Sequence, residues 1–264
     1  NDFRSLTGMN TVALILMTMV EKGSKILITA PRSGGHGSLP KLCDNLGVCY
    51  EPIPYDVVKM QIDYNRLNDI LTHDRRISYL FFCQSDLIQP PELDKIELPD
   101  SAGIIYDATQ TLGLIAGQVL PNPLELQKNI IMIGGTHKTF PGVTCGYVAT
   151  NCNEYMQKVN QNISPNYLRN VQVNNITSVC LTMLELLQFG QEYAQNIIYM
   201  ANELGRILMS KGLQIKCISP SQFSLTHQLF IETDPNDVDE AYRNFRKYGI
   251  TLNKRNTAYV VGFR

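Results

Sequence analysis

The sequence predicts an α/β fold, in which a mainly parallel sheet is sandwiched by helices and followed by a smaller α+β domain. The chain has 264 residues, 44% of them hydrophobic, which is enough for a sizeable core and too long for one minimal domain. Short apolar runs typical of buried strands alternate with helical segments in the first part, which favours a parallel sheet. After Leu213 the pattern changes to short strands around one helix. We expect a large domain at residues 1–190 and a small one at 191–264.

The large domain is expected to begin with an apolar helix and to continue as alternating strands and helices. Thr7-Gly8 precedes the helix at about Met9 to Lys22, and Gly23 follows it, as is usual at helix ends. Cys145 to Thr150 is expected to add an antiparallel strand at the sheet edge. The other expected elements are strands at Lys25–Ala30, Val48–Ile53, Ile77–Cys83, Gly103–Asp107 and Asn129–Gly135, and helices near Ser38–Leu46, Tyr64–Thr72 and Pro123–Lys128.

Two long amphipathic helices are predicted next, at about Val173 to Phe189 and Glu192 to Lys211. Gly190 and Gly212 are expected to end them, because glycine commonly follows the last helical residue. The small domain then contains expected strands near Gln214–Ile218, Leu229–Thr233 and Tyr259–Phe263, with a helix at Asp234–Tyr248.

Composition excludes several classes of function. A net charge of -1 and a pI near 6.5 give no electrostatic case for binding nucleic acid or an anionic membrane surface. No apolar run approaches the roughly 20 residues that span a bilayer, so we expect no membrane insertion and a cytoplasmic protein. Seven cysteines without a CxxC pair indicate reduced thiols, and four separated histidines make a metal site improbable. Small-molecule chemistry is the class that remains.

Lys138 is the first candidate for chemistry. It follows the apolar run that ends in Gly134-Gly135, within Thr136-His137-Lys138-Thr139. A lysine held among apolar and cationic neighbours has a lowered pKa and can form an imine with a carbonyl compound. The plain alternative is a surface lysine after a strand, which is the usual situation for this residue type.

Asp107 makes the chemical interpretation of Lys138 stronger. Another apolar strand, beginning at Gly103, runs directly into it. Parallel strands present their reactive groups at their carboxyl ends, so the two side chains are expected at the same edge of one sheet. A cofactor with a carbonyl group at one side and a basic ring nitrogen at the other needs this pair. Pyridoxal phosphate is such a cofactor.

Other polar residues fall where the same site is expected. Thr7 and Gly8 open the first helix, whose free N–H groups and dipole suit a phosphate, although an ordinary N-cap is the more usual explanation of a threonine at this position. His36 follows Gly34-Gly35 in a loop that can approach a ligand ring closely, with a plain loop histidine as the alternative.

Three separated motifs together resemble the serine hydroxymethyltransferases, within the fold-type-I pyridoxal-phosphate enzymes of the aspartate aminotransferase superfamily. The motifs are Gly34-Gly35-His36, Asp107-Ala108 with Gly113-Leu114-Ile115-Ala116, and Thr136-His137-Lys138-Thr139. They occur in the family's order and approximate spacing over nearly the whole chain, whereas any one alone is weak. The resemblance implies a sheet of the seven-stranded type in the large domain.

The resemblance implies a role for each matching residue. Lys138 would hold pyridoxal phosphate as an imine, Asp107 would keep its ring nitrogen protonated, and Arg264 would clamp the substrate carboxylate. The alternative for Arg264 is a solvated terminal side chain. The remaining implied cofactor contacts are His36 on the ring, Ser85 near the phenolic oxygen, Thr7 and Gly8 at the phosphate, Thr136 and His137 beside the lysine, and Gln110 where the family has a histidine.

The departures from the family concern the reaction more than the cofactor. Phe140 to Gly146 lacks the arginines of the family's RGPRGG, and Ile163 to Leu168 replaces its glycine segment. Family members also begin earlier and continue past the carboxylate arginine, so we expect a segment of a longer protein with an incomplete small domain.

The expected function is to make or break the Cα–Cβ bond of a small β-hydroxy amino acid, of the glycine, serine or threonine type, with an aldehyde in aldol or transaldol chemistry. A homodimer is expected. The alternatives are a folate-dependent serine hydroxymethyltransferase using tetrahydrofolate, an aminotransferase, and a catalytically silent scaffold. The general base stays open, because Gln110 cannot titrate and His36 is a catalytic candidate only by proximity.

Overall fold

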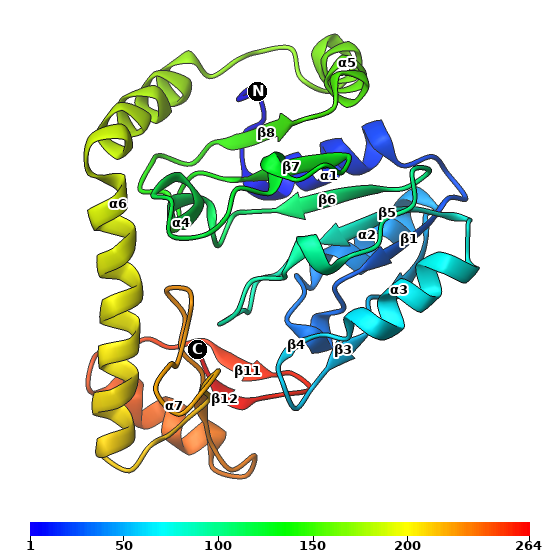
Figure 1. The fold of residues 1–264 in the computed structure, drawn as a ribbon. Helices are drawn as coiled ribbons and strands as arrows, with labels where there is room; N and C mark the ends of the chain where they lie inside the picture. Colours follow the sequence, from blue (N-terminus) through cyan, green and yellow to red (C-terminus); the bar gives the residue numbers. More distant parts are fainter.

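A six-stranded sheet forms the centre of the computed structural model, which describes residues 1–264 (Figure 1). All neighbouring strands are parallel except β7 and β8, which confirms the predicted antiparallel edge. Across the sheet the order is β2 (Cys49–Pro52), β1 (Lys25–Ile28), β5 (Ile77–Phe82), β6 (Gly103–Asp107), β7 (Ile130–Gly135) and β8 (Gly146–Thr150).

The seventh position of the expected sheet is taken by the start of the chain, which does not form a full strand. Asp2 pairs with Val148 of β8 as an isolated antiparallel bridge, through two backbone hydrogen bonds of 2.7 and 2.8 Å. The N–H of Gly146 then donates to the carbonyl of Ser5 at 2.9 Å. Residues 2–5 therefore cover the open edge of β8, and the sheet has six named strands where the resemblance implied seven.

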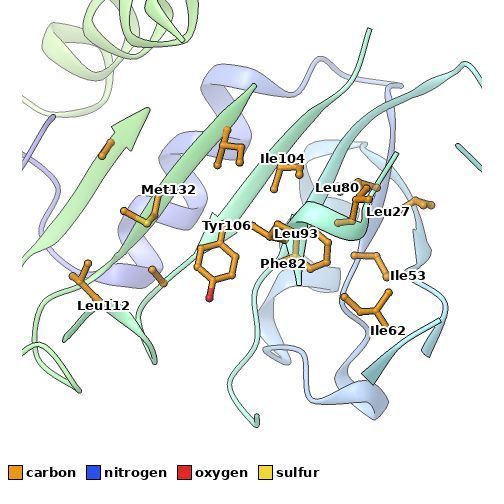
Figure 2. Packing of buried hydrophobic residues seen from close by; sticks show 14 of the residues in the cluster. Leu27, Ile53, Ile62, Leu80, Phe82, Leu93, Ile104, Tyr106, Leu112 and Met132 are labelled. Carbon is orange, nitrogen blue, oxygen red and sulfur yellow. The ribbon is translucent and has the colours of Figure 1, made fainter. Parts of the chain in front are cut away.

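Apolar side chains cover both faces of the sheet, because successive residues of a strand point to opposite sides. On β6, Ile105 belongs to one buried cluster, whereas Ile104 and Tyr106 belong to the other. The first cluster packs under α1 (Gly8–Met19), α2 (Ser38–Leu46) and α5 (Asn153–Asn162). The second packs under α3 (Tyr64–His73) and α4 (Leu112–Ala116). Figure 2 shows part of this second cluster, including Leu27, Leu80, Phe82 and Met132.

Short elements connect the strands. The β3–β4 hairpin (Tyr55–Asp56, Gln61–Ile62) was not predicted, and the helix expected near Pro123–Lys128 is only a 3-10 turn, η3 (Pro123–Glu125). That turn ends because Leu126 is extended, at φ -73° and ψ 145°. Single turns also occur at η1 (Pro31–Ser33), η2 (Leu93–Lys95) and the π-type η4 (Ile163–Tyr167).

The two long helices predicted around Gly190 are one continuous helix, α6 (Val173–Ser210), of 38 residues. The prediction that Gly190 ends a helix is therefore wrong. The glycine lies instead where Gly117, at the end of α4, packs directly on α6. The helix runs beside the main sheet and onward beside the small one (Figure 1), so the boundary predicted near residue 190 falls within it. The division into two domains stays a prediction.

The contact between Gly117 and Gly190 gives a stability prediction. A Cβ at Gly117 would lie 2.3 Å from the carbonyl oxygen of Gly190, whereas a Cβ at Gly190 would meet nothing closer than 3.4 Å. Gly117→Ala should therefore lower the free energy of unfolding by about 1–3 kcal/mol, the usual cost of overpacking. Gly190→Ala is the matched control and should be neutral or stabilising, because alanine favours helix by up to about 1 kcal/mol. Urea unfolding of the two variants checks this, and equal losses would contradict it.

The C-terminal part forms a second, antiparallel sheet. Its order is β11 (Lys254–Asn256), β12 (Val261–Phe263), β10 (Ile231–Glu232) and β9 (Gln214–Ile215), of which β11 was not predicted. Helix α7 (Val238–Lys247) packs on it through Phe245, whose ring lies 5.4 Å from that of Phe263. None of the helices, the long α6 included, combines the length and apolar character that crossing a bilayer requires.

Candidate active site

Lys138 lies in a tightly held turn after β7. The hydroxyl of Thr136 donates to the carbonyl of Val143 at 2.6 Å, and the N–H of Gly142 donates to the carbonyl of Thr136 at 3.0 Å. From α6, the hydroxyl of Tyr193 donates to the carbonyl of Thr139 at 3.0 Å. Thr136 is fully buried, whereas Lys138 is exposed to a cavity. The turn is thus fixed on both sides of a free amine.

The cavity, of about 450 Å³, brings together nearly all of the predicted site residues. Thr136 is the exception, because its side chain is buried behind the cavity wall, where its hydroxyl forms the hydrogen bond that closes the turn. The lining residues are Thr7, Gly8, Met9, His36, Gly37, Gln84, Ser85, Asp107, Thr109, Gln110, His137, Lys138, Thr144, Arg255 and Arg264. Thr109, Thr144 and Arg255 are polar members that sequence reasoning missed.

Asp107 lies at the carboxyl end of β6 with a protein donor on each oxygen. The N–H of Thr109 donates to Oδ1 at 2.9 Å, the Thr109 hydroxyl donates to the same oxygen, and the Cys83 thiol donates to Oδ2 at 3.2 Å. Burial nevertheless raises the pKa of Asp107, although these donors and the charge of His36 oppose the rise. A cation beside the carboxylate would therefore favour its ionised form strongly.

The amine of Lys138 has an electrostatic setting suited to imine chemistry. Burial lowers the pKa of Lys138, and the positive charge of Arg264 lowers it further. Asp107 acts in the opposite direction but does not outweigh them. The neutral, nucleophilic amine is thus available at lower pH than for a solvated lysine.

The N-terminus of α1 opens into the same cavity. Thr7 is the N-cap of α1, because its Oγ1 accepts a hydrogen bond from the N–H of Asn10 at 3.1 Å. The hydroxyl oxygen of Thr7 therefore has the ordinary capping role. Gly8 is buried where a Cβ would lie 3.0 Å from the amide nitrogen of Gly135, so a side chain here would crowd the start of the Lys138 turn. The first N–H groups of a helix have no intrahelical partner and favour anions.

His36 is placed by two glycines. A Cβ at Gly35 would lie only 1.9 Å from the carbonyl oxygen of Thr29, which rules out any larger residue there. The backbone N–H of His36 donates to the carbonyl of Cys83 at 2.7 Å, and its Nδ1 accepts the N–H of Ser38 at 3.3 Å. The ring is therefore anchored between the ends of β1 and β5 and lines the cavity.

Arg264 is held in the site and is not a solvated terminal side chain. Its backbone exchanges two hydrogen bonds with Asn253, of 2.9 and 3.1 Å. Its Nη1 donates to the carbonyl of Ser85 and, at 2.6 Å, to Oδ1 of Asp86. Its side chain is only 15% exposed. The guanidinium thus lies within the cavity that contains Lys138.

Gln110 occupies the position where the resembling family has a histidine. Its buried amide oxygen accepts from Nε2 of Gln228 at 3.2 Å, and the same nitrogen donates to the carbonyl of Ser85 at 3.0 Å. Gln110 therefore joins the main sheet to the C-terminal part. Its amide does not titrate, so it cannot act as a general acid or base.

The donor set fits pyridoxal phosphate. An amine and a carboxylate can serve an aldehyde and a basic ring nitrogen, an imidazole can cover the ring, and a helix N-terminus can accept a phosphate. None of these cofactor contacts requires Arg264, which lines the same cavity.

Comparison with known proteins gives consistent results. A family model described as serine hydroxymethyltransferase matches residues 2–259. The serine hydroxymethyltransferase of Picrophilus torridus is 31% identical over 96% of this chain and 59% of its own length, and that of Sulfolobus acidocaldarius is 28% identical over 88% and 54%. The solved L-threonine transaldolase of Pseudomonas fluorescens superposes with a TM-score of 0.91 at 26% identity, over 100% of this chain and 61% of that one.

The chain thus spans about six tenths of the length of the proteins that it matches. Within that span, the predicted fold class is confirmed by the superposition, and the predicted cofactor agrees with the donor set of the cavity. Because the matching model covers all but six residues of the chain, the chain belongs to the serine hydroxymethyltransferase family, whose cofactor is pyridoxal phosphate.

Proposed function

We propose that the protein is a pyridoxal-phosphate enzyme that makes or breaks the Cα–Cβ bond of a small β-hydroxy amino acid, with an aldehyde as the other reactant. The observation that carries the proposal is the placement of Lys138, Asp107 and Arg264 around one cavity. When bound, pyridoxal phosphate supplies a carbonyl group for an amine and a ring that accepts an electron pair from the α-carbon. The reaction class follows from what the three side chains do around it.

Each of the three residues has a separate task. Asp107 holds a proton at the ring nitrogen. Hydrogen bonds from Thr109 and Cys83 keep its carboxylate oriented for this task. Arg264 binds the substrate carboxylate, since its Nε and Nη2 are not used by the protein contacts of Nη1. Lys138 anchors the cofactor and afterwards holds or moves a proton at the α-carbon.

The hydrogen bonds and charges around the two nearby histidines narrow the choice of the base that removes the β-hydroxyl proton. If Nδ1 of His36 accepts from Ser38, as the geometry assigns, the neutral ring carries its proton on Nε2 and is a donor there. His227 lines a neighbouring cavity with Lys138 and Arg264, and burial and these two cations lower its pKa to about 4. His227 is therefore neutral at pH 7. Sequence reasoning did not identify this residue.

We infer transaldol chemistry without folate as the preferred reaction. The solved relative with a TM-score of 0.91 is a threonine transaldolase, and the segments at 140–146 and 163–168 depart from the family pattern. Folate-dependent hydroxymethyl transfer is the second candidate, because the curated relatives carry that name.

Product analysis separates the two reactions. Full-length protein is incubated with L-threonine and a second aldehyde without folate, and acetaldehyde and the new β-hydroxy amino acid are followed. We expect both products. Serine cleavage that depends strictly on added tetrahydrofolate, with no turnover of threonine, would reverse the assignment.

We propose a homodimer as the working form. The outer face of α6 exposes large apolar side chains, among them Leu184, Leu187 and Phe189, with Leu187 84% exposed. Exposed apolar surface of this extent is typical of protein interfaces, and most homo-oligomers are two-fold symmetric. Sedimentation at micromolar concentration should give a dimer, and a monomer saturated with cofactor would contradict the proposal.

The expected cytoplasmic location stays a prediction.

The lowered pKa of Lys138 predicts a pH dependence of cofactor capture. Only the neutral amine reacts, so the rate should rise with pH and reach its plateau below the pH expected for a solvated lysine. Arg264→Gln removes a cation that lowers this pKa, so the profile should move to higher pH. Stopped-flow absorbance with pyridoxal phosphate measures both. Arg66→Gln, on the exposed surface of α3, is the control, and coincident profiles of the Arg264 variant and the unmodified protein would argue against the assignment.

A further inference from the structure

The carboxylate of Asp86 lies between two arginines at one end of the cavity. Its side chain is 7% exposed, and its Oδ1 accepts from Nε of Arg255 and from Nη1 of Arg264, each at 2.6 Å. Both guanidinium groups line the cavity of Lys138 and are largely buried. Asp86 and Arg255 are not used by any step described above.

The net charge of Asp86 and Arg264 does not favour binding of a substrate carboxylate unless the charge of Arg255 is included. Asp86 alone neutralises Arg264, so a substrate carboxylate would meet a pair with no net charge. Arg255 adds one positive charge, which leaves the three side chains with a net charge of about +1. At short range and low dielectric, one unit of net charge changes the free energy of binding an anion considerably.

Hydrogen bonding leaves room for the anion. The two hydrogens of Nη1 of Arg264 are taken by Ser85 and Asp86, which leaves the edge formed by Nε and Nη2 free. Arg255 uses Nε on Asp86 and one hydrogen of Nη1 on the carbonyl of Lys254, at 2.9 Å, so its Nη2 is free.

We propose that Arg255 is a specificity-determining residue and Asp86 a positioning residue, which with Arg264 form a site of single positive charge for an amino acid with one carboxylate. This assignment rests on the proposed function, because it concerns the substrate of the same site. Asp86 fixes the direction of both guanidinium groups, and it prevents an excess of charge that would admit a second carboxylate.

A purely structural ion pair is the competing explanation, since Asp86 follows β5, whereas Arg255 lies on β11 and Arg264 directly follows β12. Other bonds already join these parts. The hydroxyl of Tyr259 donates to the carbonyl of Asp86 at 3.1 Å, and Gln228 bonds both Ser85 and Leu87. The two arginines are thus not needed for docking alone.

The test uses full-length protein loaded with pyridoxal phosphate, titrated with glycine and, separately, with L-aspartate, with the cofactor absorbance as the readout. Arg255→Gln should weaken glycine binding by roughly tenfold or more, as expected for loss of one charge from a buried cluster. Arg255→Lys should keep most of the affinity. The double variant Asp86→Asn with Arg255→Gln restores a net charge of about +1 and should recover most of what Arg255→Gln loses. Asp86→Asn alone should favour L-aspartate over glycine relative to the unmodified protein.

The outcomes separate this assignment from the proposed function. A double variant no better than Arg255→Gln, or Arg255→Gln with unchanged affinity, would overturn the assignment alone. If Arg255→Gln fails to fold, Arg255→Lys and Asp86→Asn decide the question through their glycine and aspartate affinities. A protein that binds cofactor but responds to no amino acid would overturn the proposed function and this assignment together. Arg66→Gln serves as the control for the substitution itself.

Discussion

Lys138→Ala should leave a folded protein that no longer holds pyridoxal phosphate covalently and has lost its activity. The turn that carries Lys138 is closed by Thr136 and Tyr193, not by the lysine side chain, so the fold should survive. Without a positioned amine, the loss should be on the order of 10⁵-fold, the scale by which a correctly placed group exceeds the same group in solution. The yellow absorbance of the protein and its label after borohydride reduction should both disappear.

Lys128→Ala is the matched control for that experiment. Lys128 also lies beside β7, and burial also lowers its pKa, but its amine donates to the carbonyls of Leu93 and Asp94. The control variant should remain yellow and active. Peptide mapping that placed the reductive label on Lys128, or on any lysine other than Lys138, would show that the amine has been misassigned.

Asp107→Asn should bind the cofactor but react on the order of 10²–10⁴-fold more slowly, which is the usual contribution of a group that holds a proton in place. The substitution keeps the shape of the side chain and removes the charge that we propose to hold a proton at the ring nitrogen. Thr109 can still bond its oxygen, so the end of β6 should not rearrange.

Spectral titration and steady-state kinetics distinguish a chemical effect from a structural one in this variant. Cofactor affinity should fall little, whereas kcat should carry the loss. Asp100→Asn, at an exposed position before β6, is the control and should be unchanged. A variant of Asp107 that kept full kcat would remove the ring nitrogen as its partner.

The parts of the fold that sequence could predict are those written in local patterns. Continuous apolar runs that end in polar residues located the strands, and the rule for parallel strands placed Lys138 and Asp107 at one edge. Gly190 misled because glycine is a strong helix-end signal. Its actual role, close contact with Gly117, depends on a residue far away in sequence.

The site residues that sequence reasoning missed share the same cause. Asp86 and Arg255 are 169 residues apart, and neither lies in a motif that would single it out. Cys83 ends an apolar strand and looks like a core residue until its thiol is seen to donate to Asp107. Thr136 was expected beside the lysine from the family resemblance, and its hydroxyl is used to close the turn. Pairings of this kind are set by the tertiary fold and leave no periodic trace.

The exchange of the α-proton of glycine tests the account most directly, because it needs the cofactor, Lys138, Asp107 and the carboxylate site but neither folate nor an aldehyde. Full-length protein loaded with pyridoxal phosphate is incubated with glycine in D₂O, and loss of the α-proton signal is followed by NMR. We expect exchange without folate that is abolished in Lys138→Ala and slowed in Asp107→Asn. A protein that holds the cofactor on Lys138 and shows no exchange, with or without tetrahydrofolate, would contradict the claim that this site activates the α-carbon of an amino acid.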